Sequence, residues 1–232
     1  MWIGRLAGPV EPLPAAFFAE DADRVARRLL GQLLVHETPE GPLVARIVET
    51  EAYFGPPGTN PQLKRRRDLP AELRRELWEA GDPASHAGRG QTARSAVMWG
   101  DPGTAYVYLI YGMYECLNVV TGPEGEPQAV LLRAAEPVEG LERMQARRPK
   151  AKAGDLLKGP GRLAKAFGLS RALTGTPLTA PPVYFAKGDP PREVAVGPRV
   201  NVVGSEHYPL RFIEAASPHV SGARPVRKLP SR

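Results

Sequence analysis

Apolar residues recur along the chain at two spacings, and the spacing typical of a helix comes first. From about Asp21 onward, Val25, Leu29, Leu30 and Leu33 recur at the interval that places side chains on one face of an α-helix. Similar patterns predict short helices around residues 73–78, 141–148 and 158–167, the last of which starts at a Gly-Pro-Gly segment.

The second spacing is the alternation of a β-strand. Residues 43–53 read LVARIVETEAY, which predicts a strand with Ile47, Glu49 and Glu51 on one face, followed by the turn residues 55–58. Residues 104–111 and 113–121 are rich in strand-forming residues and flank a glycine, which predicts a hairpin with its tip near Tyr111 and Gly112.

The order of the elements indicates the fold class. Further strands are predicted at 129–134, 199–203 and 210–214, and strands do not alternate regularly with helices. This order favours an α+β fold with a mainly antiparallel sheet over a doubly wound parallel sheet. The length of 232 residues and the hydrophobic content of 42% suffice for one core, so we expect a single domain over 1–232.

Two segments are expected to depart from this domain core. Residues 59–82 are charged and include four consecutive cations at 64–67, which predicts an excursion from the core. Residues 222–232 are basic and contain proline, which predicts a flexible tail.

Composition narrows the function classes. The net charge of +6 favours a polyanionic partner without identifying it. The single cysteine, Cys116, cannot form an internal disulfide, and the four histidines show no metal-ligand spacing, so we expect neither a metal nor another cofactor. No apolar run has the length of a membrane span and no secretory signal is recognisable, which predicts a cytoplasmic protein without membrane contact.

Two carboxylates, Glu49 and Glu51, share the predicted strand face. If both were buried they would repel each other, and such a pair could act as the acid and base of a sugar hydrolase. They could also lie at the solvent-exposed edge of the sheet. The spacing leaves both interpretations open.

The predicted hairpin concentrates aromatic residues. Four of the seven tyrosines, Tyr106, Tyr108, Tyr111 and Tyr114, lie within nine residues. A ring at a hairpin tip can wedge between base pairs and rings lower in the sheet can hold an extruded base, although tyrosines in strands also pack ordinary cores.

Three further polar residues are candidates for a site. His86 lies among small residues, where it could reach a ligand or face solvent. Asn118 and Arg133 interrupt apolar strand segments, so they need solvent or a polar network, because burying an unpaired donor costs about 1–3 kcal/mol.

Five segments carry a resemblance to a known family. They are RIVETEAYFGP at 46–56, ASHA and QTARSAVM within 84–98, PGTAYVYLIYGMYECLNVVT at 102–121, VLLRAAEP at 130–137 and GPGRL at 159–163. Together they resemble the alkyladenine DNA glycosylase family, also called the 3-methyladenine or N-methylpurine DNA glycosylases, over roughly residues 15–220. The resemblance implies a single mixed domain with a curved antiparallel sheet, surrounding helices and a protruding β-hairpin that enters the minor groove.

The resemblance also implies roles for individual residues. Glu51 is the general base that activates water, Arg133 lies near that water, and the main-chain carbonyl of Val200 helps to hold it. The remaining implied roles are contact with the flipped base by Tyr53, His86 and Tyr108, filling of the vacated stack by Tyr111, and exclusion of the guanine amine by Asn118.

The implied activity is that of a monofunctional DNA glycosylase that starts base excision repair. It flips alkylated purines such as 3-methyladenine and 7-methylguanine, with deaminated and etheno purines as further candidates, out of duplex DNA and hydrolyses the N-glycosidic bond with water. No lysine occupies a motif position, so we expect no Schiff base and no strand cleavage. The expected partner is damaged duplex DNA, bound by a monomer.

Two other function classes remain open, and the sequence differs from the family pattern at one place. The chain could be a non-catalytic nucleic-acid-binding module, in which the tyrosines stack bases and the glutamates are structural, or a glycosidase acting on nucleosides or saccharides. About two dozen residues, including the cations 64–67, separate the Gly-Pro turn from the Ser-His segment, where the family has only a few. These residues could contact phosphates or form a solvated excursion.

Overall fold

The computed structural model describes residues 10–222 and 227–228. Its strands are β1 Leu33–Thr38, β2 Gly41–Tyr53, β3 Ala105–Ile110, β4 Tyr114–Thr121, β5 Gln128–Glu139, β6 Val183–Ala186, β7 Val194–Gly197, β8 Arg211–Glu214 and β9 Arg227–Lys228. Its helices are α1 Ala22–Leu29, α2 Ala71–Glu79, α3 Leu141–Arg147 and α4 Pro160–Phe167. These elements alternate irregularly along the chain, as the sequence predicts.

All strand pairs are antiparallel, and the strands form one open sheet. The order is β3-β4-β5-β2-β8-β7-β9, and β1 pairs with both β2 and β6. The first half of β2 pairs with β1 and its second half with β8, so the sheet branches along this strand. The predicted α+β fold with a mainly antiparallel sheet is confirmed.

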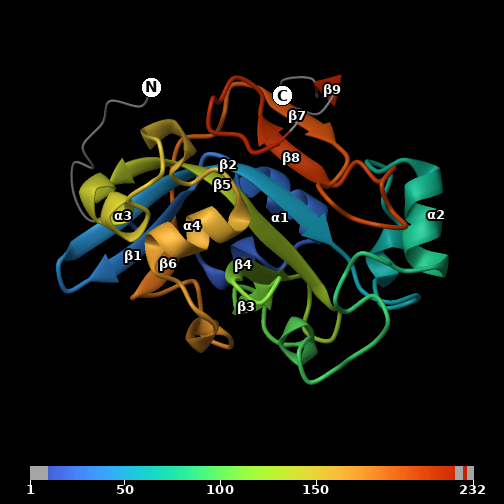
Figure 1. The fold of residues 1–232 in the computed structure, drawn as a ribbon. Helices are drawn as coiled ribbons and strands as arrows, with labels where there is room; N and C mark the ends of the chain where they lie inside the picture. Colours follow the sequence, from blue (N-terminus) through green and yellow to red (C-terminus); the bar gives the residue numbers. More distant parts are fainter. Residues whose placement is uncertain (1–9, 223–226, 229–232) are drawn as a thin grey trace.

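Helices cover the sheet from both sides. Figure 1 shows α1 behind β2 and β5, whereas α4 lies in front of the sheet. The apolar face of α1, with Val25 and Leu29, belongs to the main core, as its spacing predicts. The predicted helix is too long, because it includes Leu33. The chain turns at Gly31, and Leu33 is the first residue of β1. Gly31 has φ +84°, and a Cβ there would lie 2.1 Å from the carbonyl oxygen of Asp189.

The predicted hairpin and most other elements lie where the sequence places them. β3 and β4 meet at Tyr111 and Gly112, which both have positive φ, of 53° and 68°. The strand predicted at 199–203 is wrong, because these residues form a loop in which Asn201 has φ 56°, a left-handed conformation that interrupts an extended chain. The strands β1, β6 and β7 are additions to the predicted set.

A bulge in β2 separates Ile47 from the two glutamates. Before the bulge the odd-numbered residues Leu43, Ala45 and Ile47 belong to the main core, whereas after it the even-numbered Ala52 and Phe54 do. The register shifts on both sides of Glu49, which leaves Val48 without a partner on β5. The predicted common face for Ile47, Glu49 and Glu51 is therefore wrong for Ile47, because the extra residue reverses the alternation.

Residues 59–82 do not form the expected excursion from the core. This segment contains α2, and Leu63, Leu73 and Leu77 belong to the main core. Of the four consecutive cations, Lys64, Arg65 and Arg67 are exposed, but Arg66 is buried.

The expected tail at 222–232 lies almost entirely outside the described residues, except that the backbone of β9 pairs with β7. Among the described residues, no helix is both long and apolar enough to cross a membrane.

Candidate active site

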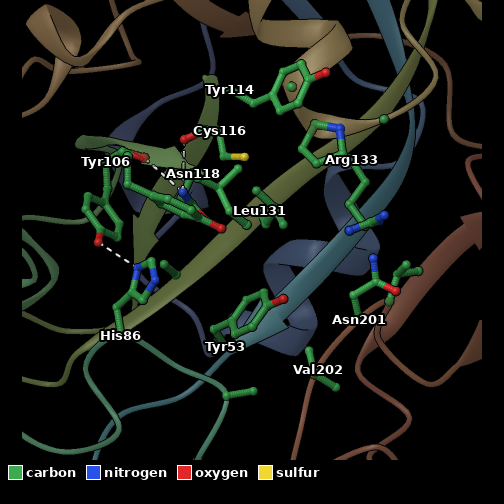
Figure 2. A pocket seen from close by; sticks show the side chains of 18 of the residues that line it. Tyr53, His86, Tyr106, Tyr114, Cys116, Asn118, Leu131, Arg133, Asn201 and Val202 are labelled. Carbon is green, nitrogen blue, oxygen red and sulfur yellow. Dashed lines mark hydrogen bonds between the residues drawn. The ribbon is translucent and has the colours of Figure 1, made fainter. Parts of the chain in front are cut away.

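A pocket of about 820 Å³ opens between the β3–β4 hairpin, the end of β2, β5, the start of α4 and two loops. The loops contribute residues 83–86 and 200–203. A volume of this size is typical of sites that enclose a small molecule. Figure 2 shows the side chains of these distant segments meeting around the pocket.

Glu51 lies directly behind the wall of this pocket. Its side chain has no exposed surface, and the three groups that contact it come from residues that line the pocket. Oε1 accepts a hydrogen bond from the backbone N–H of Val200 at 2.7 Å. Oε2 accepts one from the Tyr53 hydroxyl at 2.8 Å and a longer one from Arg133 Nη1 at 3.4 Å.

Strand alternation and a second bulge explain this arrangement. The hydroxyl of Thr50 donates to Ala26 O on α1, so the neighbouring Glu49 and Glu51 point to the opposite face of β2. On β5, Ala134 pairs with Glu49 and Leu132 pairs with Thr50, which leaves Arg133 as the extra residue between them. The bulge directs Arg133 between the two carboxylates.

Glu49 is held from three directions and does not contact the pocket. Its Oε1 accepts hydrogen bonds from Arg133 Nε at 3.0 Å and Arg211 Nε at 2.7 Å, and its Oε2 accepts one from the backbone N–H of Ser221 at 2.6 Å. Two arginines thus balance two buried carboxylates, which resolves the repulsion expected for such a pair. The solvent-edge interpretation is excluded, because both carboxylates are fully buried.

The charges of this cluster support one another. Burial acts to lower the pKa of Arg133, but the nearby negative charges of Glu51 and Glu49 outweigh burial and raise it. Burial, together with the charge of Glu51, raises the pKa of Tyr53 well above its ordinary value. The Tyr53 hydroxyl therefore keeps its proton and remains a donor to Glu51 at neutral pH.

A second buried ion pair supports Tyr53 from behind. Arg199 donates to both carboxylate oxygens of Asp82, at 2.6 and 2.8 Å, and to Ala52 O and Ser205 Oγ. The Arg199 guanidinium lies 4.5 Å from the centre of the Tyr53 ring. This contact joins the end of β2 to the loop that carries Val200.

Aromatic rings form the wall nearest the hairpin. The His86 ring centre lies 4.4 Å from that of Tyr108 in an edge-to-face arrangement, and His86 Nδ1 lies 2.8 Å from the Tyr106 hydroxyl. His86 is an exposed residue, but desolvation of its ring against the tyrosines, with a smaller contribution from the charge of Arg94, lowers its pKa to about 4. The imidazole is therefore neutral at neutral pH.

The floor of the pocket is polar at one point. The Asn118 side-chain amide donates to the carbonyls of Tyr106 and Cys116, at 3.0 and 3.3 Å, as the dashed lines in Figure 2 show. The buried Asn118 thus has the polar network that its position in an apolar strand requires. Burial raises the pKa of the neighbouring Cys116 thiol to about 11, so this group stays protonated and unreactive.

Tyr111 lies at the rim of the pocket and differs from the other tyrosines in its exposure. It occupies the hairpin tip, and 74% of its surface is accessible. Beside the tip, at the first residue of β4, α4 approaches Tyr114 so closely that a Cβ on Gly161 would lie 2.8 Å from Tyr114 Cβ. Gly161, the second glycine of the GPGRL segment, thus allows α4 to form one side of the pocket.

The structure brings together all the site residues named from the sequence. Tyr53, His86, Tyr108, Tyr111, Asn118, Arg133 and Val200 line one pocket, and Glu51 lies behind its wall. Sequence reasoning did not identify Arg199, Asp82, Arg211 and Ser221, since each pairs with a partner far away in the sequence. Within the described chain, no group of three His, Cys, Asp or Glu residues could hold a metal ion.

Comparison with known proteins identifies the family of the chain. A sequence model of the methylpurine-DNA glycosylase family (MPG) matches residues 16–218. A protein of Streptomyces avermitilis is 44% identical over 220 residues, which cover 92% of each chain. Relatives from Methanocella arvoryzae and Salinibacter ruber are 42% and 44% identical, covering 92% and 93% of this chain and 97% and 99% of their own. All three carry the name "Putative 3-methyladenine DNA glycosylase".

The fold, the site and these similarities define the class of the protein as a DNA glycosylase of DNA repair. The chain belongs to the methylpurine-DNA glycosylase family, because the match extends over most of its length.

Proposed function

We propose that the protein is a monofunctional glycosylase that takes a damaged purine out of duplex DNA and hydrolyses its bond to the sugar with an activated water. The substrates are 3-methyladenine and 7-methylguanine first, and deaminated and etheno purines as weaker ones. The observation that carries the proposal is the buried Glu51 carboxylate, held by three donors directly behind an aromatic pocket.

Glu51 is suited to activate a water molecule. A carboxylate has about four acceptor positions, and Val200, Tyr53 and Arg133 occupy three of them. The fourth position accepts the hydrogen bond of a water, and the negative charge opposes the positive charge that develops on the sugar during bond cleavage. Glu51 has no exposed surface in the free protein, so we expect the water to reach this position when the wall of the pocket adjusts to the entering base.

Arg133 and Val200 orient Glu51, and Val200 also contacts the water directly. Arg133 balances the charge of the carboxylate and fixes its rotation, and the amide of Val200 fixes its other oxygen. The same peptide segment presents the main-chain carbonyl of Val200, which accepts the second hydrogen bond of the water.

The aromatic wall favours purines that carry a positive charge. Methylation at N3 or N7 makes the purine cationic, and a cation over the face of an aromatic ring gains about 0.5–2 kcal/mol. Tyr53 and Tyr108 supply such faces, and the neutral His86 adds no charge that would repel the base. Neutral damaged bases lack this attraction, so their release is slower. Asn118, anchored to two carbonyls, restricts the space for an exocyclic amine.

Hydrolysis without strand cleavage agrees with the placement of the amines. Among the residues that line the described pocket, Lys165 alone carries an amine, and it is exposed on α4. A lysine that forms a Schiff base must reach the reacting carbon and lose its proton, which burial promotes and exposure does not. Lys165 and the exposed Arg162 on the same helix are instead placed to contact phosphates at the rim.

The proposal is tested by release of free base from alkylated duplex DNA. Wild-type protein should release 3-methyladenine and leave an abasic site in an uncut strand, whereas Glu51→Gln should bind the same DNA but release base about 100-fold to 10,000-fold more slowly, the usual contribution of a general base. Glu142→Gln, a change of an exposed carboxylate on α3, is the control. Single-turnover release by Glu51→Gln at the wild-type rate would refute the assignment, and binding without release by the wild type would favour a non-catalytic module.

A further inference from the structure

Large apolar side chains are exposed at both sides of the pocket, not only on the hairpin. Among the described residues, the large apolar side chains that are exposed are those of Tyr111, Met113, Tyr114, Leu141 and Val203. Three of them lie at the hairpin tip and Leu141 begins α3, but Val203 belongs to the loop that carries Val200. Val203 is the most exposed of the five, with 81% of its surface accessible.

The loop of Val203 lies across the pocket from the hairpin. Figure 2 shows Asn201 and Val202 of this loop on the opposite side from Cys116 and Asn118 of β4. Val203 and Tyr111 both line the pocket, so each is an exposed apolar group on one of two facing rims.

The position of Val203 is fixed by the catalytic network. At the start of the loop, the Arg199 side chain binds Asp82 and Ser205 Oγ, which joins the two ends of the loop. The next residue donates its backbone N–H to Glu51. Asn201 then adopts φ 56°, a left-handed conformation that asparagine tolerates better than most residues and that turns the chain toward Val203. These contacts hold the loop on both sides of Val203, whose side chain is exposed to solvent.

An exposed apolar group at such a place suits distorted DNA. Apolar side chains that enter the minor groove press against sugars or separate base steps, and they gain from burial only when the duplex opens. The chain is basic, and the exposed cations Arg162 and Lys165 line the same pocket, which favours DNA over an apolar protein surface as the partner.

We propose that Val203 is a second contact with the duplex, which holds the DNA open on the side of the pocket opposite Tyr111. This inference rests on the proposed function. Tyr111 fills the space left by the flipped nucleotide, and Val203 packs against the backbone sugar or the adjacent base pair beyond it. The two residues together prevent the opened stack from closing over the pocket.

The test compares two substrates that differ in the cost of opening. One is duplex DNA with a damaged purine in a base pair, and the other has the same purine in a one-nucleotide bulge, which is already partly unstacked. Val203→Ser should lower kcat/KM on the paired substrate roughly tenfold, equivalent to about 1.4 kcal/mol, with little loss on the bulged one. Val203→Ile should keep wild-type rates on both, because it retains an apolar side chain. Leu141→Ser is the control for exposed apolar residues away from the pocket.

Equal rates for Val203→Ser and the wild type on the paired substrate would overturn the proposal. So would an equal loss on both substrates, which indicates disturbance of the Glu51 network. Fluorescence of 2-aminopurine beside the damaged base, measured in the Glu51→Gln background, reports opening without turnover. If the wild type releases no base, the proposed function fails, but a weaker fluorescence change on adding Val203→Ser to Glu51→Gln would still support the contact, and an unchanged one would refute it.

Discussion

The hydroxyl of Tyr53 donates a 2.8 Å hydrogen bond to Oε2 of Glu51, two residues earlier on the same strand. Residues two apart in a strand point to the same face, so this contact follows from the VETEAY sequence once β2 forms. Tyr53 thereby covers the carboxylate in the free protein and presents its ring to the pocket. One side chain thus connects the place where a base would stack with the group that would activate water.

Replacing Tyr53 with Phe should slow base release while the ring remains in place. The variant loses the donor that fixes Oε2, so Glu51 is oriented by Val200 and the longer contact with Arg133 alone. We expect the single-turnover rate to fall about tenfold, near the lower limit for losing a hydrogen bond to a charged group. DNA affinity should change little.

Tyr184→Phe is the matched control for this change, because Tyr184 donates a similar hydrogen bond to Glu37, outside the pocket. It should release base at the wild-type rate. If Tyr53→Phe also did so, the hydrogen bond would have no part in the reaction.

Removing the exposed ring at the hairpin tip should weaken capture of the flipped state. Stacking of a base on an aromatic side chain contributes about 1–3 kcal/mol, so Tyr111→Ala should reduce the population of opened DNA tenfold or more. Tyr111→Trp should retain most of the effect because it keeps an aromatic face. Stopped-flow 2-aminopurine fluorescence measures the opening, and an unchanged amplitude and rate in Tyr111→Ala would contradict a wedge role.

The local parts of the site could be predicted from the sequence, whereas its long-range parts could not. The strand with Glu51 and the hairpin with Tyr111 follow from alternation and turn residues within about twenty residues each. The bulge that aligns Arg133 with the glutamates leaves no such trace, because a bulge adds one residue without changing the composition of the strand. The pairing of Arg199 with Asp82 spans 117 residues and appears only when the fold is known.

The segment 59–82 shows the same limit more sharply. Four consecutive cations indicate solvent exposure, and three of them are exposed. The fourth, Arg66, contacts Asp21 and Asp23 at 2.7–2.8 Å, and all three side chains are buried. Local charge density therefore cannot distinguish a solvated cation from one that joins α1 to the rest of the protein.

Arg66 should be essential for stability, although it lies in a highly charged run. Arg66→Met leaves two buried carboxylates without their main cation, a loss that typically costs about 3–5 kcal/mol. The neighbouring changes Arg65→Met and Arg67→Met affect exposed side chains and should alter the free energy of unfolding by less than about 0.5 kcal/mol. Urea denaturation of the three variants measures the difference. Equal stability of all three would show that Arg66 does not balance the aspartates in solution.

His86 should make the stability of the protein depend on pH over a defined range. In the unfolded chain it binds a proton near its ordinary pKa of 6.5, whereas in the folded protein desolvation of its partly exposed ring against the tyrosines, with the charge of Arg94, lowers the pKa to about 4. Between these values the unfolded chain binds a proton that the folded protein does not, so stability falls as the pH decreases from about 6.5 to about 4. Above pH 6.5, His86 is neutral in both the folded and the unfolded state, so its protonation no longer reduces the free energy of unfolding.

His86→Gln removes this titration but keeps a polar side chain, so the comparison isolates it from the other acidic groups. We expect the unfolding free energy of the wild type, minus that of His86→Gln, to decrease between pH 7.5 and pH 4.5, as measured by urea denaturation followed by tryptophan fluorescence. Parallel pH profiles for the two proteins would mean that His86 titrates alike in both states, and so that its contacts with the tyrosine rings do not desolvate it. The neutral wall proposed to receive a cationic purine would then carry a positive charge at mildly acidic pH, and the preference for methylated bases would need another source.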